Sequence, residues 1–179
     1  CGPIGLYATL LASRSGAGKI IVIGAPASRL ELAKEWGATD TINLDEVTAH
    51  NARVEIVKEL TGGLGAKFAI EGTGFPAAFD QGFDFLRKDS TYLVLGQTSD
   101  ASIPFAPGKV MQKQCIVIGN GSADIRHFYK ALKFIQAYRN SVDFSKLITT
   151  KYTLENVNEA LDSMQKGRDI KAAIDFRGR

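Results

Sequence analysis

The sequence has few of the residues that mark a secreted, metal-binding or membrane protein. Its 179 residues include two cysteines, Cys1 and Cys115, with no C-x-x-C pair and no paired histidines. This indicates a reducing compartment without disulfides and without a metal site among these residues, so we expect a cytoplasmic protein. No apolar run reaches the roughly 18 residues that a membrane-spanning helix needs, and no signal peptide is seen. Because the chain does not begin with methionine, we expect its natural N-terminus to lie upstream.

Charge of one sign is also scarce. The net charge is +3, the basic residues are spread over separate segments, and no run of five like charges occurs. This argues against a nucleic-acid partner. With 45% apolar and 23% charged residues the composition is that of a globular protein. The length suits one sizeable core.

What the chain does have is a regular alternation of helical and strand-like segments. Ser28 and Glu31 have the spacing of a capping box at the start of one helix. The alternation predicts an α/β fold, a doubly wound parallel sheet with helices on both faces. We expect helices at 5–15, 28–36, 47–60, 76–87, 124–138 and 154–165, a helical turn near Val110, and strands at 19–23, 39–43, 68–70, 92–95, 115–118, 147–152 and 170–176.

The first five residues, Cys1-Gly2-Pro3-Ile4-Gly5, open an apolar helix. Gly2 and Gly5 have the spacing of the last two glycines of the dinucleotide-binding turn G-x-G-x-x-G, whose first glycine and preceding strand lie outside this sequence. In a complete turn the middle glycine admits a pyrophosphate to the backbone, and the N–H groups of the first helical turn bind it. A half motif is weak evidence, because glycine-rich turns before helices are common.

Several predicted strands also end in glycine, at Gly24, Gly72, Gly96 and Gly119. In doubly wound sheets ligands bind outside the carboxyl ends of the strands. Each glycine alone could simply end its strand, but their recurrence beside Gly2 and Gly5 favours a ligand site. The missing first strand is expected between the strands near Ile21 and Ile70.

These segments together resemble the medium-chain, zinc-type alcohol dehydrogenase family over nearly the whole chain. The resemblance is carried by Gly2-Pro3-Ile4-Gly5-Leu6, Val22-Ile23-Gly24, 29–34, Trp36-Gly37-Ala38, 60–66, 70–74, Leu95-Gly96-Gln97, Leu147-Ile148-Thr149 and 167–171. It implies the cofactor-binding part of an oxidoreductase that transfers a hydride between an alcohol or polyol and NAD or NADP. Residues 1–140 would form the dinucleotide-binding domain, lacking its first strand, and 141–179 a β-α-β tail that in the family returns to the catalytic domain.

The resemblance also implies roles for individual residues. Gly2, Pro3, Ile4 and Gly5 would hold the cofactor pyrophosphate, which Lys171 would also contact. Arg29 would reach the adenosine end. The remaining expected cofactor residues follow strands: Gly72 and Thr73 through their backbone, Leu95, Gly96, Asn120 and Gly121 beside the nicotinamide, and Gln97. Phe75, Gln97 and Asn120 are expected to border the substrate pocket.

Gly24 departs from the family pattern. NAD-binding members usually carry an acidic residue there, which binds the ribose 2′-hydroxyl. Its absence removes a repulsion against the 2′-phosphate of NADP, and the Ser28 hydroxyl and Arg29 could receive that phosphate. The choice between NAD and NADP therefore stays open.

The second departure is the catalytic domain. In the family, zinc and its ligands belong to an N-terminal domain that this sequence lacks, so zinc is expected only there. His50 and His127 have no ligand spacing to either cysteine. We therefore assign no catalytic or metal residue and expect the chain alone to be inactive. A non-catalytic nucleotide-binding module is the alternative, and a Rossmann-like methyltransferase is less favoured.

The apolar strand near 115–118 is a candidate sheet edge, and unpaired apolar edges promote association. In the resembling family the corresponding strand pairs across a dimer. We expect a homo-oligomer, a dimer or tetramer, with a nicotinamide dinucleotide as ligand and a small-molecule alcohol as the substrate of the full-length enzyme.

Overall fold

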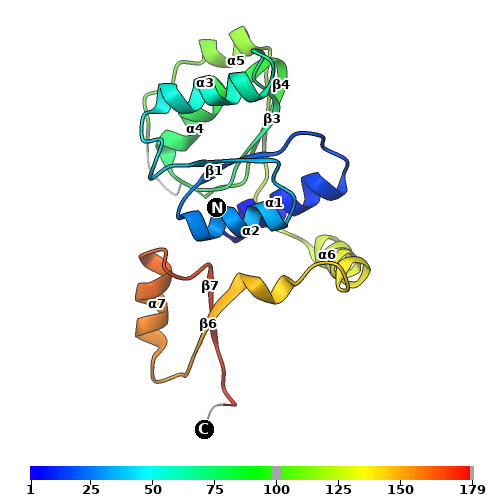
Figure 1. Ribbon diagram of the computed structural model, residues 1–179, viewed down its shortest axis with the longest axis vertical. Helices are drawn as coiled ribbons and strands as arrows, with labels where there is room; N and C mark the ends of the chain where they lie inside the picture. Colours follow the sequence, from blue (N-terminus) through cyan, green and yellow to red (C-terminus); the bar gives the residue numbers. More distant parts are fainter. Residues whose placement is uncertain (98–101, 178–179) are drawn as a thin grey trace. The chain divides into compact units, whose positions relative to one another are not determined.

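The computed structural model describes residues 1–97 and 102–177. It divides into two compact units, Cys1–Ser122 and Ala123–Arg179, which are described separately. The elements are α1 (Pro3–Arg14), β1 (Ile21–Gly24), α2 (Ala27–Glu35), β2 (Asp40–Asn43), α3 (His50–Leu60), β3 (Ala66–Glu71), α4 (Pro76–Gly82), the 3₁₀ turn η1 (Phe83–Phe85), β4 (Leu86–Val94), α5 (Gly108–Lys113), β5 (Ile116–Gly119), α6 (Ile125–Tyr138), η2 (Phe144–Leu147), β6 (Ile148–Tyr152), α7 (Val157–Gln165) and β7 (Lys171–Ile174) (Figure 1).

The first unit contains two parallel sheets. One pairs β1 with β2, and the other has the order β3-β4-β5. Among the described residues β1 and β3 are not hydrogen-bonded neighbours, and this is the position where the expected strand order lacks its first strand. The predicted α/β fold with parallel strands is confirmed.

Helices α1 and α2 pack against each other through apolar side chains. The rings of Tyr7 and Trp36 lie 5.6 Å apart. Leu6 and Leu10 of α1 are fully buried, and so is Ala33 of α2. These residues recur at helical spacing, which explains why both segments form helices with one buried side.

The core of the β3-β4-β5 sheet is centred on Tyr92, Phe83 and Leu86. The Tyr92 hydroxyl donates hydrogen bonds to the carbonyls of Ala78 and Phe79 in α4, both at 3.2 Å. Burial is the main reason why the pKa of Tyr92 is raised above its usual value. The aromatic cluster thus fastens α4 and η1 to one face of this sheet.

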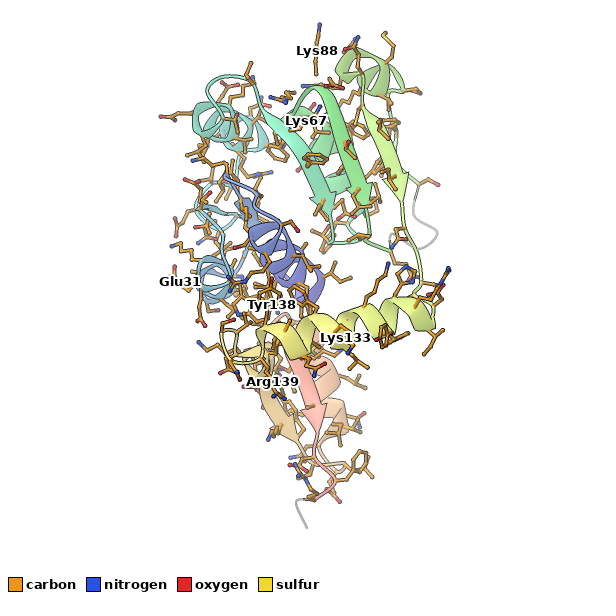
Figure 2. The ribbon with its side chains drawn as sticks, turned by 90° about the vertical axis from the view of Figure 1, so that its right-hand side faces the viewer. Glu31, Lys67, Lys88, Lys133, Tyr138 and Arg139 are labelled. Carbon is orange, nitrogen blue, oxygen red and sulfur yellow. The ribbon has the colours of Figure 1, made fainter. Side chains whose placement is uncertain are left out.

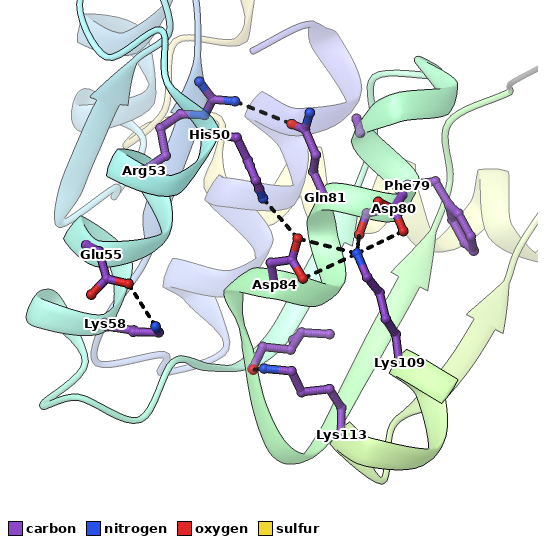
Figure 3. Close-up of polar contacts among 12 residues, drawn as sticks. His50, Arg53, Glu55, Lys58, Phe79, Asp80, Gln81, Asp84, Lys109 and Lys113 are labelled. Carbon is purple, nitrogen blue, oxygen red and sulfur yellow. Dashed lines mark hydrogen bonds and ion pairs between the residues drawn. The ribbon is translucent and has the colours of Figure 1, made fainter. Parts of the chain in front are cut away.

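A polar network joins the helices on that face (Figure 3). His50 at the start of α3 lies 3.0 Å from Asp84 in η1. Lys109 of α5 lies 2.9 Å from Asp80 of α4 and 3.3 Å from Asp84. Lys109 therefore bridges two carboxylates, and the network ties α3, α4, η1 and α5 into one layer.

The other face of the β3-β4-β5 sheet is apolar and open. The register places Phe68 beside Ile116 and Ile70 beside Ile118, with one β4 residue between each pair. Phe68 is 68% exposed and Ile116 is 62% exposed. Strand β5 ends the sheet, so the predicted apolar edge near 115–118 is confirmed. Parallel sheets are ordinarily covered on both faces, so we expect this apolar face to be covered in the assembled protein.

In the second unit β6 and β7 form a parallel pair, and α7 connects them. This is the β-α-β tail that the sequence predicts. Helix α6 begins with a capping box between Asp124 and His127. Near its end Phe134 contacts Tyr138 and, at 6.4 Å between ring centroids, Phe144 of η2.

Several expected boundaries need correction: the helix expected over 154–165 begins only at Val157, and the strand expected over 92–95 begins already at Leu86. The capping box at Ser28 is wrong: α2 starts one residue earlier, at Ala27, and the Pro26 carbonyl accepts the N–H of Arg29 at 3.0 Å. The helix expected over 76–87 stops at Gly82, because η1 and then β4 take over the following residues. The helix expected over 47–60 begins only at His50.

The division into units also differs from the expected domain boundary. The first unit ends at Ser122, so α6 groups with the C-terminal residues rather than with the sheet that precedes it. The assignment of 1–140 and 141–179 to separate roles stays a prediction. Residues 178 and 179, the end of that tail, lie outside the described residues.

Candidate cofactor site

The N-terminus of α1 is built to receive an anion. Gly2 is the N-cap, and no side chain caps the helix. The first helical bond runs from the Leu6 N–H to the Gly2 carbonyl at 3.0 Å, so the N–H groups of Ile4 and Gly5 have no partner within the helix. The first turn carries no acidic residue that would oppose an anion.

The two glycines keep the space before this helix clear. A Cβ atom at Gly2 or at Gly5 would meet no atom within 4 Å. Side chains at these positions would therefore project into open space rather than into the protein. A ligand backed by the N–H groups of the first turn would occupy that space, so the residues present fit a dinucleotide pyrophosphate.

The ends of β1 and β3 lie against the same turn. A Cβ atom at Gly24 would lie 2.5 Å from Cys1 Sγ, and one at Gly72 would lie 3.2 Å from Ile4 Cγ2. Arg29 lies on the first turn of α2, a few residues after the end of β1. Gly2–Gly5, Gly24 and Gly72, distant in sequence, thus meet around the start of α1.

Glu71 stabilises the turn after β3, a role that was not predicted from the sequence. Its carboxylate is 4% exposed, and one oxygen accepts hydrogen bonds from the N–H and hydroxyl of Thr73, at 2.6 and 2.5 Å, and from the Gly74 N–H at 3.1 Å. The available signal was a carboxylate followed by Gly-Thr-Gly at the end of an apolar strand. Glu71 holds Gly72 and Thr73 in place at the carboxyl end of β3.

The turn after β4 packs against the turn after β3, at the carboxyl ends of the two strands. The N–H groups of Leu95 and Gly96 both donate to the Glu71 carbonyl, at 2.8 and 3.0 Å. A Cβ atom at Gly96 would collide with the Glu71 carboxylate, and one at Gly74 would lie 2.7 Å from the Gln97 carbonyl oxygen. Close packing of the two turns therefore explains both glycines.

After β5, the Asn120 N–H donates to the Val94 carbonyl at 3.1 Å, and Gly121 follows it. In Figure 2 Lys67 and Lys88 lie at the opposite end of the strands from the arrowheads, away from this edge. The carboxyl ends of β3, β4 and β5 thus gather the residues that we expect beside the nicotinamide.

Two further predicted residues are Ser28 and Lys171. Ser28 is exposed on the first turn of α2. Lys171 is the exposed first residue of β7 and belongs to the second unit. The cofactor roles of these two residues, like those of the residues around the start of α1, stay predictions.

Zinc has no ligand set in the part of the chain that the structure describes. Across residues 1–97 and 102–177, no three histidine, cysteine, aspartate or glutamate side chains group closely enough to hold a metal ion. The two histidines have other contacts: His50 faces Asp84, and His127 lies 2.9 Å from Asp124. Nor does any helix in this part combine the length and apolar character that a membrane crossing requires.

Comparison with known proteins matches the chain to dehydrogenases. The sequence pattern of the zinc-binding dehydrogenases matches residues 3–137. The 5-exo-hydroxycamphor dehydrogenase of Pseudomonas putida is 31% identical over 175 residues, which cover 97% of this chain and 48% of that protein. The sorbitol dehydrogenase of Halalkalibacterium halodurans is 33% identical, covering 97% of this chain and 49% of the relative.

Solved structures give the same result. An alcohol dehydrogenase from Thermotoga maritima superposes with a TM-score of 0.86 at 32% identity, covering 97% of this chain and 47% of that one. The chain thus spans about half the length of the relatives that it matches. The chain belongs to the zinc-binding dehydrogenases, the zinc-type medium-chain alcohol dehydrogenase family, and corresponds to their C-terminal cofactor-binding part.

Proposed function

We propose that this chain is the NAD(P)-binding portion of a medium-chain dehydrogenase that acts on an alcohol or polyol. The observation that carries the proposal is the start of α1, where two glycines leave open space in front of N–H groups that have no partner within the helix. Gly24 and Gly72 lie against the same turn, at Cys1 and Ile4. With no side chains of their own, they leave the backbone accessible to a pyrophosphate.

Each part of the cofactor is assigned to its own set of residues. Gly2, Pro3, Ile4 and Gly5 hold the pyrophosphate. Arg29 and Ser28 serve the adenosine ribose, where either a 2′-hydroxyl or a 2′-phosphate is accommodated. The nicotinamide is bordered by Gly72, Thr73, Leu95, Gly96, Gln97, Asn120 and Gly121.

When bound, the nicotinamide exchanges a hydride with the alcohol carbon. This chain's residues bind and orient that ring; the zinc and the proton-transferring groups are expected in an N-terminal catalytic domain. The chain alone is therefore expected to bind the cofactor without oxidising an alcohol. A non-catalytic nucleotide-binding module would show the same binding.

The test is a titration of the chain with NADH and NADPH, followed through the emission of its one tryptophan, Trp36. We expect saturable quenching with at least one of the two cofactors and no NAD(P)-dependent alcohol oxidation. Absence of saturable binding would refute the proposal. Alcohol oxidation by the chain alone would refute the expectation that catalysis needs an N-terminal domain. Turnover after addition of a relative's N-terminal half would distinguish the enzyme from the non-catalytic module.

A further inference from the structure

The carboxylate of Glu71 occupies the N–H groups of the turn that follows β3. Its oxygen Oε1 accepts hydrogen bonds from the N–H and the hydroxyl of Thr73 and from the Gly74 N–H. The same Thr73 hydroxyl accepts the N–H of Phe75, the N-cap of α4, at 3.0 Å. Three successive backbone N–H groups are therefore used inside the protein and are not available to a ligand.

The turn after β4 is tied to the same residue through the main chain. The Glu71 carbonyl accepts the N–H groups of Leu95 and Gly96 at 2.8 and 3.0 Å. The second carboxylate oxygen, Oε2, is buried where a Cβ atom at Gly96 would collide with it, and it has no hydrogen-bond partner within residues 1–97 and 102–177. Both turns thus lie around a buried carboxylate, and the N–H groups that they would offer to an anion are occupied.

The start of α1, beside these turns, has the opposite character. The N–H groups of Ile4 and Gly5 have no partner within the helix, and the first turn carries no acidic side chain. A Cβ atom at Gly72 would lie 3.2 Å from Ile4 Cγ2, so the two places adjoin. Free N–H groups at a helix N-terminus attract an anion, whereas a buried carboxylate repels one at short range. An extended ligand would therefore place its phosphates at α1 and a part without negative charge at the two turns.

A nicotinamide dinucleotide has parts of both kinds. Its pyrophosphate is anionic, while the nucleoside on the nicotinamide side carries hydroxyl and amide donors and no negative charge. In doubly wound sheets the adenosine ribose lies at the end of the strand after the glycine turn, which here is β1. The ends of β3 and β4 are left for the second nucleoside, and the charge at Glu71 suits it.

We propose that Glu71 is a positioning residue that sets the direction in which the cofactor lies: it occupies the N–H groups that a phosphate would need and fixes the two turns against which the second nucleoside packs. This inference rests on the proposed function. A carboxylate that only stabilised the fold would affect all nucleotides alike. A residue with this role separates ligands that share one half and differ in the other.

The experiment compares three ligands that share the adenosine diphosphate unit. NADH continues from it with a nucleoside, ATP continues with a further phosphate, and ADP ends there. Calorimetric titrations without magnesium measure the three affinities for the full chain and for Glu71→Gln. Glu55→Gln, at an exposed carboxylate of α3, is the matched change.

The amide of Glu71→Gln removes the charge while keeping the shape of the side chain. Whichever way the amide turns, it either buries an NH₂ group beneath Gly96 or leaves the donors of Thr73 and Gly74 without an acceptor. We expect NADH binding to weaken about tenfold as the turns loosen, and ATP binding to strengthen about threefold as the repulsion is lost. ADP binding should change by less than about twofold, and Glu55→Gln should leave all three affinities unchanged.

The outcomes separate the two claims. If the unmodified chain binds neither NADH nor ADP, the proposed function fails and this inference falls with it. If the chain binds them but Glu71→Gln changes all three affinities equally, or changes none, the inference alone is overturned. Should Glu71→Gln fail to fold by circular dichroism, Thr73→Val decides, because it removes one donor and keeps the carboxylate. NADH binding should then weaken relative to ADP while ATP binding stays as it was, and equal losses for the three ligands would overturn the inference.

Discussion

Gly24 stands at the end of β1 where a carboxylate would select against NADP. It is buried against Cys1, so the position offers no side chain to either form of the cofactor. The neighbouring charge is that of Arg29, in the first turn of α2. We therefore expect Arg29 to decide how strongly the chain discriminates between the two cofactors.

Replacing Arg29 by alanine should weaken NADPH binding about tenfold and change NADH binding much less, because a charge-assisted bond to the 2′-phosphate is lost. The measurement is a pair of fluorescence titrations. Lys34→Ala, which removes a positive charge farther along the same helix, serves as the control. Equal losses for the two cofactors would contradict the phosphate role of Arg29.

The carboxylate of Asp169 makes the stability of the chain depend on pH. It is buried and accepts hydrogen bonds from a cluster of four hydroxyls, those of Thr149, Thr150, Tyr152 and Ser163. Since its pKa is lowered in the folded state, its stabilisation is fully present above the unfolded value of about 4 and is lost as the pH falls toward the folded value. The free energy of unfolding should therefore differ most between the unmodified chain and Asp169→Asn at neutral pH. That difference should shrink below about pH 4.

Denaturant unfolding by circular dichroism at a series of pH values measures this difference. A difference that stays constant from neutral pH to about pH 2 would show that the hydroxyl cluster does not depend on the ionised carboxylate.

How far single residues could be predicted depends on how local their partners are. Gly2, Gly5, Gly24, Gly72 and Gly96 could be proposed as site residues because a glycine after a strand or before a helix has a local meaning. The partners of Asp169 lie 6 to 20 residues away and became visible only when β6, α7 and β7 were assembled. Glu71 looked like one scattered carboxylate because two of its three donors are backbone N–H groups, so the Gly-Thr-Gly that follows it was the only local signal of its role.

Among the elements, β5 bears most directly on association between chains. It ends its sheet, and Ile116 and Ile118 extend the open apolar face that Phe68 and Ile70 begin. An apolar edge next to an apolar face promotes pairing with another chain, and a lysine on such an edge opposes it. This is the structural basis of the homo-oligomer that we expect.

An Ile118→Lys change should therefore shift the chain toward the monomer. Sedimentation equilibrium over a range of concentrations measures the shift. Ile148→Lys on β6 is the matched control, since both isoleucines are 45% exposed. A clean monomer at high concentration in the unmodified chain, or unchanged association in Ile118→Lys, would contradict a role for this edge.

Elements were predicted better than their boundaries. Each strand expected from a short β-branched or apolar run is present, because such runs are buried in parallel sheets. The start of α2 was misplaced, since Pro26 supplies the cap and Ser28 already lies in the first turn. The bulge at Thr149, an extra residue of β6 in its pairing with β7, could not be foreseen, because it is a property of two strands together and not of either sequence.

At the scale of the whole molecule, the match to the family covers 97% of this chain but only about half of each relative. Strands β1 and β3 lie in separate sheets among the described residues, with the cofactor turn at Gly2–Gly5 adjoining the ends of both. We propose that this turn binds the pyrophosphate of a nicotinamide dinucleotide.

Gly2→Asp tests that claim most directly. Aspartate is a favoured N-cap and its charge stabilises a helix N-terminus, while its Cβ meets no atom within 4 Å, so the fold should tolerate it. The same charge repels a pyrophosphate. Gly18→Asp, at another position where a Cβ meets open space, is the control.

We predict that Gly2→Asp keeps or raises the melting temperature and weakens NADH binding at least about tenfold, the effect of one charged contact. Gly18→Asp should bind NADH like the unmodified chain. Unchanged NADH affinity in a folded Gly2→Asp chain would contradict the assignment of this turn to the cofactor.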